Sequence, residues 1–168
     1  GDCIQHPEFV RECLLNRAEK TVLSGRRTEL SPWVTQKLTP QKIRDGYMSR
    51  NLWWILISIM HRAHAEAGKG LYMRDSWLRR KINQRPRPLV GCNFAGNKID
   101  FENINGFDIR YEGIGAGEDS DIDFRLGISG VKIQSMVHAA VQFHLWHPFL
   151  KRPSVNEGMF NDVVAKKD

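Results

Sequence analysis

A glycine-rich stretch followed directly by acidic residues constrains this chain more than any other feature. Four glycines fall within residues 106–117, and the carboxylates of Glu118, Asp119, Asp121 and Asp123 come next. Such a loop brings its backbone close to a ligand, and acidic side chains complement the dipole in the first turn of a helix. Capping of that helix is one explanation of the acids. Acid–base chemistry on a docked substrate is the other.

Composition and charge predict one folded domain with affinity for anions. The 168 residues are 41% hydrophobic and 26% charged, which is typical of a globular domain, so residues 1–168 are expected to share one fold. The formal net charge is +6, and the charges are segregated. Residues 62–87 hold eight Lys or Arg and two acids, whereas residues 100–123 hold eight acids and one arginine. An acidic segment on a basic chain suits a divalent cation or a catalytic centre.

Cysteine usage and hydropathy bear on the compartment. Cys3, Cys13 and Cys92 are odd in number and show no CxxC spacing, so neither a disulfide framework nor a zinc site is expected. The longest apolar run, residues 52–60, is about half the length of a membrane span. These features predict a cytoplasmic protein that is soluble or peripheral at the inner face of the membrane.

Apolar periodicity and turn residues predict the alternating helices and strands of an α/β fold. The expected helices cover residues 7–20, 40–63 and 101–105, and the expected strands cover residues 21–25, 89–94, 131–133 and 139–143. Thr39 is expected to cap the second helix, which opens a basic helical insert at residues 40–88. The tail after Pro153 carries no motif and is expected to fray.

Tryptophans lie beside arginines in the insert and leave two interpretations open. Trp53 and Trp54 share the 40–63 segment with apolar residues on its other side, so that helix is apolar nearly all round. It either packs against a neighbouring element or lies on an anionic membrane surface, with the basic residues 62–87 beside it.

Four short motifs, taken in order, resemble one enzyme family. They are Gly91-Cys92-Asn93, Asn105-Gly106-Phe107-Asp108, Gly117-Glu118-Asp119-Ser120-Asp121 and Phe143-His144-Leu145-Trp146-His147-Pro148. Their order and spacing resemble the acceptor half of family 2 glycosyltransferases, especially those whose C-terminal half is similar to the galactosyltransferases. The resemblance implies the C-terminal half of a GT-A type α/β sandwich, a mixed sheet with flanking helices. The nucleotide-binding half has no counterpart here, so an upstream half or a partner chain is expected to supply it.

The resemblance also implies a reaction and its catalytic residues. The expected reaction is inverting, metal-dependent transfer of a sugar from a nucleotide sugar, such as a UDP-sugar, to a polysaccharide or glycolipid acceptor. In the resembled family the Asp of the Glu-Asp pair removes the proton of the acceptor hydroxyl, a role that falls to Asp119. Glu118 is then expected to bind the acceptor or to orient the site.

Metal and substrate contacts follow from the same resemblance. The start Gly1-Asp2-Cys3-Ile4 resembles the end of an Asp-x-Asp motif, so Asp2 is expected to bind Mn²⁺, or Mg²⁺, together with His144. The expected substrate-binding residues are Asn93 for a donor-sugar hydroxyl, Trp146 for stacking on a sugar, and Gly117 and Asp121. Ile114 and Ala116 stand where galactosyltransferase relatives have a tryptophan, so transfer of galactose to an N-acetylhexosamine is not implied.

A non-catalytic binding module for nucleic acid or an anionic membrane is the alternative function. The basic charge and interleaved aromatic residues favour it. The acidic segment 100–123 would repel a phosphate backbone, and no nucleic-acid-binding motif is present, so no nucleic-acid partner is expected.

Overall fold

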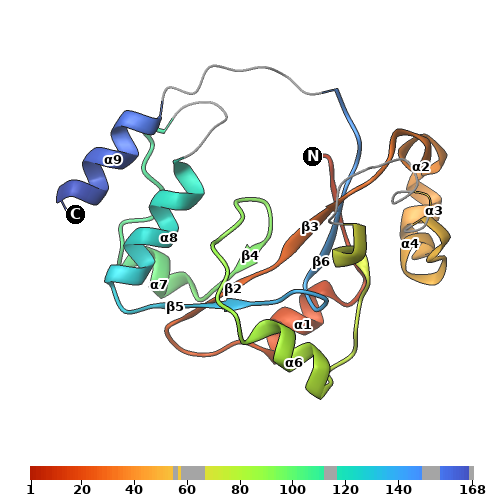
Figure 1. Ribbon diagram of the computed structural model, residues 1–168, viewed down its shortest axis with the longest axis horizontal. Coiled ribbons are helices and arrows are strands. Elements are labelled where there is room, and N and C mark those ends of the chain that lie inside the picture. Colours follow the sequence, from red (N-terminus) through yellow and green to blue (C-terminus); the bar gives the residue numbers. More distant parts are fainter. Residues whose placement is uncertain (55–56, 58–66, 112–116, 149–155, 167–168) are drawn as a thin grey trace.

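The computed structural model describes residues 1–54, 57, 67–111, 117–148 and 156–166 (Figure 1). Within these ranges the chain is an α/β domain with two small mixed sheets, as the sequence predicted. Helices gather at the two ends of the view and beneath the strands that run through its centre. No helix among the residues described is long and apolar enough to cross a bilayer.

Two three-stranded sheets form the centre of the domain. Their strands are β1 (Cys3–Gln5), β2 (Thr21–Ser24), β3 (Arg26–Glu29), β4 (Phe94–Ala95), β5 (Lys132–Ser135) and β6 (Val141–His144). One sheet has the order β1-β6-β3 and the other has the order β4-β2-β5. The pairs β2/β5 and β3/β6 are parallel, whereas β1/β6 and β2/β4 are antiparallel. One continuous segment, residues 21–29, therefore contributes the central strand of one sheet, β2, and an edge strand of the other, β3.

The side chain of Asn93 fills the junction between the two sheets. Its Nδ2 donates hydrogen bonds of 3.0 Å to the carbonyl of Arg26, on β3, and to the carbonyl of Ala140, just before β6. The Gly25 N–H, which lies between β2 and β3, donates to the Asn93 carbonyl at 2.9 Å. A Cβ on Gly25 would lie 2.2 Å from Asn93 Oδ1, so only glycine fits at this point of the chain. Asn93 thus ties the two sheets together.

Short helices surround the sheets, and several begin where a side chain caps them. The helices are α1 (Phe9–Leu15), α2 (Pro32–Lys37), α3 (Pro40–Arg44), α4 (Tyr47–Arg50), the 3₁₀ turn η1 (Ala67–Gly70), α6 (Trp77–Asn83), α7 (Lys98–Glu102), α8 (Glu118–Ile128) and α9 (Glu157–Lys166). The hydroxyls of Ser31, Thr39 and Ser76 accept N–H groups at the starts of α2, α3 and α6. The predicted cap at Thr39 is confirmed.

Three apolar clusters pack the helices against the strands. In the first, Trp54 is fully buried against Phe143 of β6, with the rings nearly perpendicular and 5.2 Å apart. The second packs Phe9 of α1 against Leu23 and Met136. The third packs Ile122 and other α8 residues against Val22 of β2. These contacts fix α1 and α8 on the sheets that carry the candidate site residues.

Several expected elements differ in the structure. The single helix expected from Pro40 is broken, because Gly46 takes a left-handed conformation between α3 and α4 and Asn51 is extended after α4. Residues 55–56 and 58–63 of that helix lie outside the described part. The expected helix 7–20 shrinks to α1, and the tail expected to fray contains α9 instead. Of the strand expected at residues 89–94, only Phe94 lies in a strand, β4. The helix expected at residues 101–105 is α7, which begins and ends three residues earlier.

Candidate functional site

Strand pairing brings Asp2 to the end of β6. Cys3 lies opposite His144 in the antiparallel pair β1/β6, and the N–H of Leu145 donates to the Asp2 carbonyl at 2.8 Å. The Asp2 carboxylate then lies beside two imidazoles. Its Oδ2 is 3.3 Å from His144 Nε2 and 3.4 Å from His147 Nε2. The sequence expected Asp2 and His144 to share a site, and the structure places them in contact.

The opposite side of His144 faces Glu29 of β3. Glu29 lies opposite His144 in the parallel pair β3/β6, and its carboxylate contacts His144 Nδ1. Arg27, two residues earlier on the same strand, holds the other Glu29 oxygen through an ion pair of 2.8 Å. A neutral His144 that donates from Nδ1 to Glu29 presents an unprotonated Nε2 to Asp2. Nε2 and the Asp2 carboxylate are then both acceptors, and a cation or a proton between them is required for attraction.

The donor set fits a borderline divalent cation. A carboxylate oxygen and two imidazole nitrogens are ligands that first-row divalent cations take in proteins, and the contact of Glu29 with His144 Nδ1 is the outer-shell arrangement that metal-binding histidines usually have. Cys3 Sγ is also nearby, since the ligand atoms of Asp2, Cys3 and His144 lie within 4.8 Å of one another. Burial, and then the neighbouring Cys92, raise the pKa of the Cys3 thiol to about 12, so Cys3 favours the neutral, weakly ligating form.

Charge interactions keep Asp2 ionised. Desolvation opposes ionisation, but hydrogen bonds from its own backbone and from Cys3 help to outweigh it and lower the pKa of Asp2. The Asp2 side chain is 53% exposed, so solvent and ligands reach it.

Helix α8 presents the expected catalytic acids on its first turn. Gly117 caps this helix with φ of 150°, a backbone conformation that other residues rarely adopt, and a Cβ there would lie 2.5 Å from the Tyr111 ring. Glu118 is exposed at the first helical position, and Asp119 follows it. The glycine loop at residues 112–116, with Ile114 and Ala116, lies outside the described residues.

Asp119 is tied to the turn at residues 91–93. Its Oδ2 accepts the N–H of Gly91 at 3.2 Å, while its Oδ1 accepts the N–H of Ser120 at 3.1 Å. On the other side of the turn, Arg27 lies 4.0 Å from Cys92 Sγ. The turn therefore links the carboxylate of α8 to the strand whose Arg27 and Glu29 support His144.

Other expected substrate contacts fall in different surroundings. Asn93 is only 1% exposed and both N–H groups of its amide are bonded to backbone, so it is not available to a sugar hydroxyl in this structure. Its Oδ1 has no hydrogen-bond partner among the described residues and faces Gly25. Asp121 is buried and pairs with Arg125, which also donates to the carbonyl of Ile104. Trp146, by contrast, is half exposed and lies between the two histidines in the sequence.

The structure gives Asp121, which was expected to bind substrate, a structural contact. Its carboxylate fixes α8 to the turn after α7 through Arg125, and no part of it reaches the surface. Asp123 also has a structural contact, since its Oδ2 accepts the N–H of Leu89 at 3.3 Å. Burial raises the pKa of Asp123. Of the other two acids in the first turn of α8, Glu118 is exposed and Asp119 is half-buried.

Much of this site lies in the segment that is similar to a known enzyme family. Residues 79–148 match the family model described as the N-terminal domain of galactosyltransferase. The segment is glycosyltransferase-like. It contains the turn at residues 91–93, Glu118, Asp119, His144 and His147, and it covers less than half of the chain. No curated protein matches the chain. Membership of family 2 and the GT-A architecture stay predictions.

Sequence reasoning did not select Glu29 and gave His147 no role. Glu29 lies 115 residues from His144, and only the register of β3 on β6 brings them together. His147 carries a weak local signal, because it follows His144 by three residues, but its contact with Asp2 depends on the path of the chain after β6.

Proposed function

We propose that this chain carries the metal-binding and acceptor-activating half of an inverting glycosyltransferase. The proposed reaction transfers a sugar from a nucleotide sugar, such as a UDP-sugar, to a polysaccharide or glycolipid acceptor. One observation carries the proposal: the Asp2 carboxylate lies 3.3 Å from Nε2 of His144 and 3.4 Å from Nε2 of His147, in a chain whose segment 79–148 is glycosyltransferase-like.

In this proposal Asp2, His144 and His147 hold the cation, which is Mn²⁺ or Mg²⁺. When bound, the cation supplies positive charge that stabilises the departing diphosphate. Glu29 keeps the proton of His144 on Nδ1, so that Nε2 stays free to act as a ligand. Arg27 holds Glu29 in place by its ion pair. The half-exposed Trp146 beside this cluster offers an aromatic face to a sugar ring.

Asp119 is the proposed general base. Hydrogen bonds from Gly91 and Ser120 orient its two oxygens, and each oxygen keeps a further lone pair for a proton. Asp119 thereby removes the proton of the acceptor hydroxyl as that oxygen attacks the anomeric carbon from the face opposite the leaving group, which inverts the configuration. Glu118, exposed next to it, orients the acceptor.

An upstream half or a partner chain is proposed to supply the pocket for the base and ribose of the donor. The proposed setting is the cytoplasm, and the three free cysteines are consistent with its reducing conditions.

Calorimetric titration of Mn²⁺, with and without UDP, tests the proposal. The wild-type chain is expected to bind Mn²⁺ more tightly when UDP is present, since the diphosphate oxygens add ligands. Asp2→Ala with His144→Ala is expected to abolish this binding. Asp45→Ala is the matched control, because Asp45 is an exposed carboxylate at the end of α3 whose side chain, within the described part of the chain, is bonded only to Gln41.

A second measurement separates the cation site from the base. Wild type and Asp119→Asn are each combined with a nucleotide-binding half from a related enzyme and assayed for sugar transfer. Asp119→Asn should bind Mn²⁺ and UDP as wild type does and lose transfer by about a hundredfold or more. Equal Mn²⁺ binding by wild type and the Asp2, His144 double variant would overturn the proposed cation site.

A further inference from the structure

Helix α6 carries an exposed tryptophan and leucine side by side. Trp77 is 74% exposed and Leu78 is 44% exposed. Large apolar side chains placed together at the surface usually mark a binding site. Among the residues that the structure describes, these two side chains of α6 are left largely uncovered and can meet a partner.

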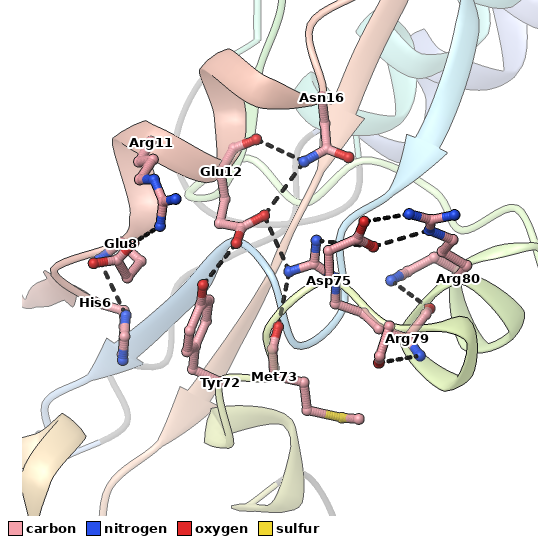
Figure 2. Close-up of polar contacts among 12 residues, drawn as sticks. His6, Glu8, Arg11, Glu12, Asn16, Tyr72, Met73, Asp75, Arg79 and Arg80 are labelled. Carbon is pink, nitrogen blue, oxygen red and sulfur yellow. Dashed lines mark hydrogen bonds and ion pairs between the residues drawn. The ribbon is translucent and has the colours of Figure 1, made fainter.

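A buried ion pair fixes which side of α6 faces inward. Arg79 is buried and lies 3.0 Å from the Glu12 carboxylate of α1, and it also donates to the carbonyl of Met73 at 2.8 Å. Tyr72 donates to the other Glu12 oxygen at 2.7 Å. Figure 2 shows these groups converging between α1 and α6. We call the cluster of Glu12, Tyr72 and Arg79 the α1–α6 brace. It holds α6 against the domain through Arg79.

The position of Arg79 determines the outward face. At about 100° per residue, Trp77 and Lys81 both lie roughly 160° from Arg79, and Leu78 and Arg80 lie roughly 100° to either side of it. Lys81 and Arg80 are exposed. Figure 2 shows Arg80 turned to Asp75, away from the Glu12 contact of Arg79. The outward face of α6 thus combines an aromatic ring, a branched apolar side chain and cations.

The charge around this face is strongly positive. Residues 74–87 hold six Lys or Arg and one acid, Asp75, which Arg80 neutralises. Among the residues described, Arg74 and Lys81 have no ion-pair partner. Arg74 also lines a hollow of about 610 Å³ between α1 and residues 72–79, as does Arg11. Two cations without an ion-pair partner among the described residues therefore lie near Trp77 in the sequence, Arg74 three residues before it and Lys81 four residues after it.

We propose that this face, defined as Arg74, Trp77, Leu78, Arg80 and Lys81, docks the protein on an anionic lipid bilayer. Trp77 and Leu78 insert at the level of the headgroups, where tryptophan is favoured, while Arg74 and Lys81 contact lipid phosphates. The partner follows from charge complementarity and from the leucine: an aliphatic side chain gains from an apolar interior, whereas a nucleic acid offers it no stacking. Docking is independent of the proposed sugar transfer.

Sedimentation with lipid vesicles tests the docking face. The chain is mixed with vesicles of phosphatidylcholine alone or with added phosphatidylglycerol, at low and high salt. Wild type is expected to bind only the anionic vesicles, and less at high salt. Arg74→Glu with Lys81→Glu should weaken binding at least twentyfold, given roughly fivefold per cation. Trp77→Ser should weaken it roughly tenfold.

Matched variants keep the test specific. Lys98→Glu with Lys132→Glu reverses two exposed charges on α7 and β5, and Ile109→Ser removes the isoleucine that is most exposed among the described residues; each should bind as wild type does. Circular dichroism of every variant checks folding. Three results would overturn the proposal: equal binding to neutral vesicles, unchanged binding in both α6 variants, or a gel shift of DNA at physiological salt that only the α6 charge variant loses.

Discussion

Two clusters in this molecule place a carboxylate against nitrogen groups, and they differ in every other respect. In the α1–α6 brace, the Glu12 side chain is 4% exposed and each of its oxygens accepts a hydrogen bond, from Tyr72 and from Arg79. At the end of β6, the Asp2 side chain is 53% exposed and a single oxygen faces two imidazole nitrogens. The first cluster is closed and complete, and the second is open.

The difference shows which cluster has a structural role. Burial opposes ionisation of Glu12, but hydrogen bonds from Arg79 and Tyr72 outweigh it and lower the pKa of Glu12. Burial and the bond to Glu12 raise the pKa of Tyr72 to about 12. Every charge in the brace is therefore balanced from within the chain. At Asp2 the chain brings acceptors together, which costs stability unless a cation or proton binds there.

Breaking the brace is the largest effect expected. Glu12→Gln leaves the Arg79 guanidinium buried without its counter-charge, and loss of one partner of a buried pair costs about 3 kcal/mol or more. The midpoint of urea unfolding, followed by circular dichroism, should fall accordingly. Mn²⁺ binding by the fraction that stays folded should not change.

Glu8→Gln is the control for this substitution. Glu8, the residue just before α1, pairs with Arg11 of that helix, but both side chains are open to solvent, so its loss should cost less than about 1 kcal/mol. An equal loss of unfolding free energy in the two variants would show that the buried Glu12–Arg79 pair stabilises the fold no more than the exposed Glu8–Arg11 pair does.

The brace also shows where sequence reasoning reached its limit. The apolar spacing of residues 7–20 predicts a helix with Phe9, Val10 and Leu14 on one side. The structure buries Phe9 and Glu12 instead and exposes Val10 and Leu14. Glu12 turns inward because Arg79, 67 residues away, neutralises it. A pattern of hydrophobic residues does not reveal a buried charge whose partner is distant in the chain.

Local signals were more informative. The strand at residues 21–24, the cap at Thr39 and the start of α8 after Gly117 each depend on neighbouring residues, and each is confirmed. The placement of Asp2 beside His144 came from the resemblance alone, because a β-sheet register joins residues 142 positions apart. Glu29 could not be predicted for the same reason, because only the register of β3 on β6 brings it to His144.

Substitution of Glu29 should weaken metal binding by the open cluster of Asp2, His144 and His147. Glu29→Gln removes the carboxylate that keeps the His144 proton on Nδ1, so Nε2 becomes a poorer ligand. Loss of such a partner typically weakens metal binding by 10 to 100-fold, about 1.4 to 2.7 kcal/mol. Calorimetry with Mn²⁺ and UDP measures the change. Glu102→Gln on α7, an exposed acid paired with Lys98, is the control and should bind as wild type does.

Low pH should remove the stability that ionised Glu12 contributes to the α1–α6 brace. Because the pKa of Glu12 is lower in the folded chain than its ordinary value of 4.5, ionised Glu12 stabilises the fold above that pH. The contribution is lost as the pH falls through the folded pKa. The difference in unfolding free energy between wild type and Glu12→Gln should therefore narrow when urea melts are repeated from neutral pH to below 4.5. A constant difference would contradict an ionised Glu12.

The smallest effect expected is on stability at the open cluster. Asp2→Asn should change the free energy of unfolding by less than about 0.5 kcal/mol, since the side chain is half exposed and makes no buried ion pair. Any change should be a gain, because the amide of asparagine offers a donor to His144 Nε2 where the carboxylate offers only acceptors. Urea melts without metal measure it, and Mn²⁺ binding should be lost in the same variant. A cost above about 1 kcal/mol would instead make Asp2 and a protonated His144 a structural ion pair, of the same kind as Glu12 and Arg79.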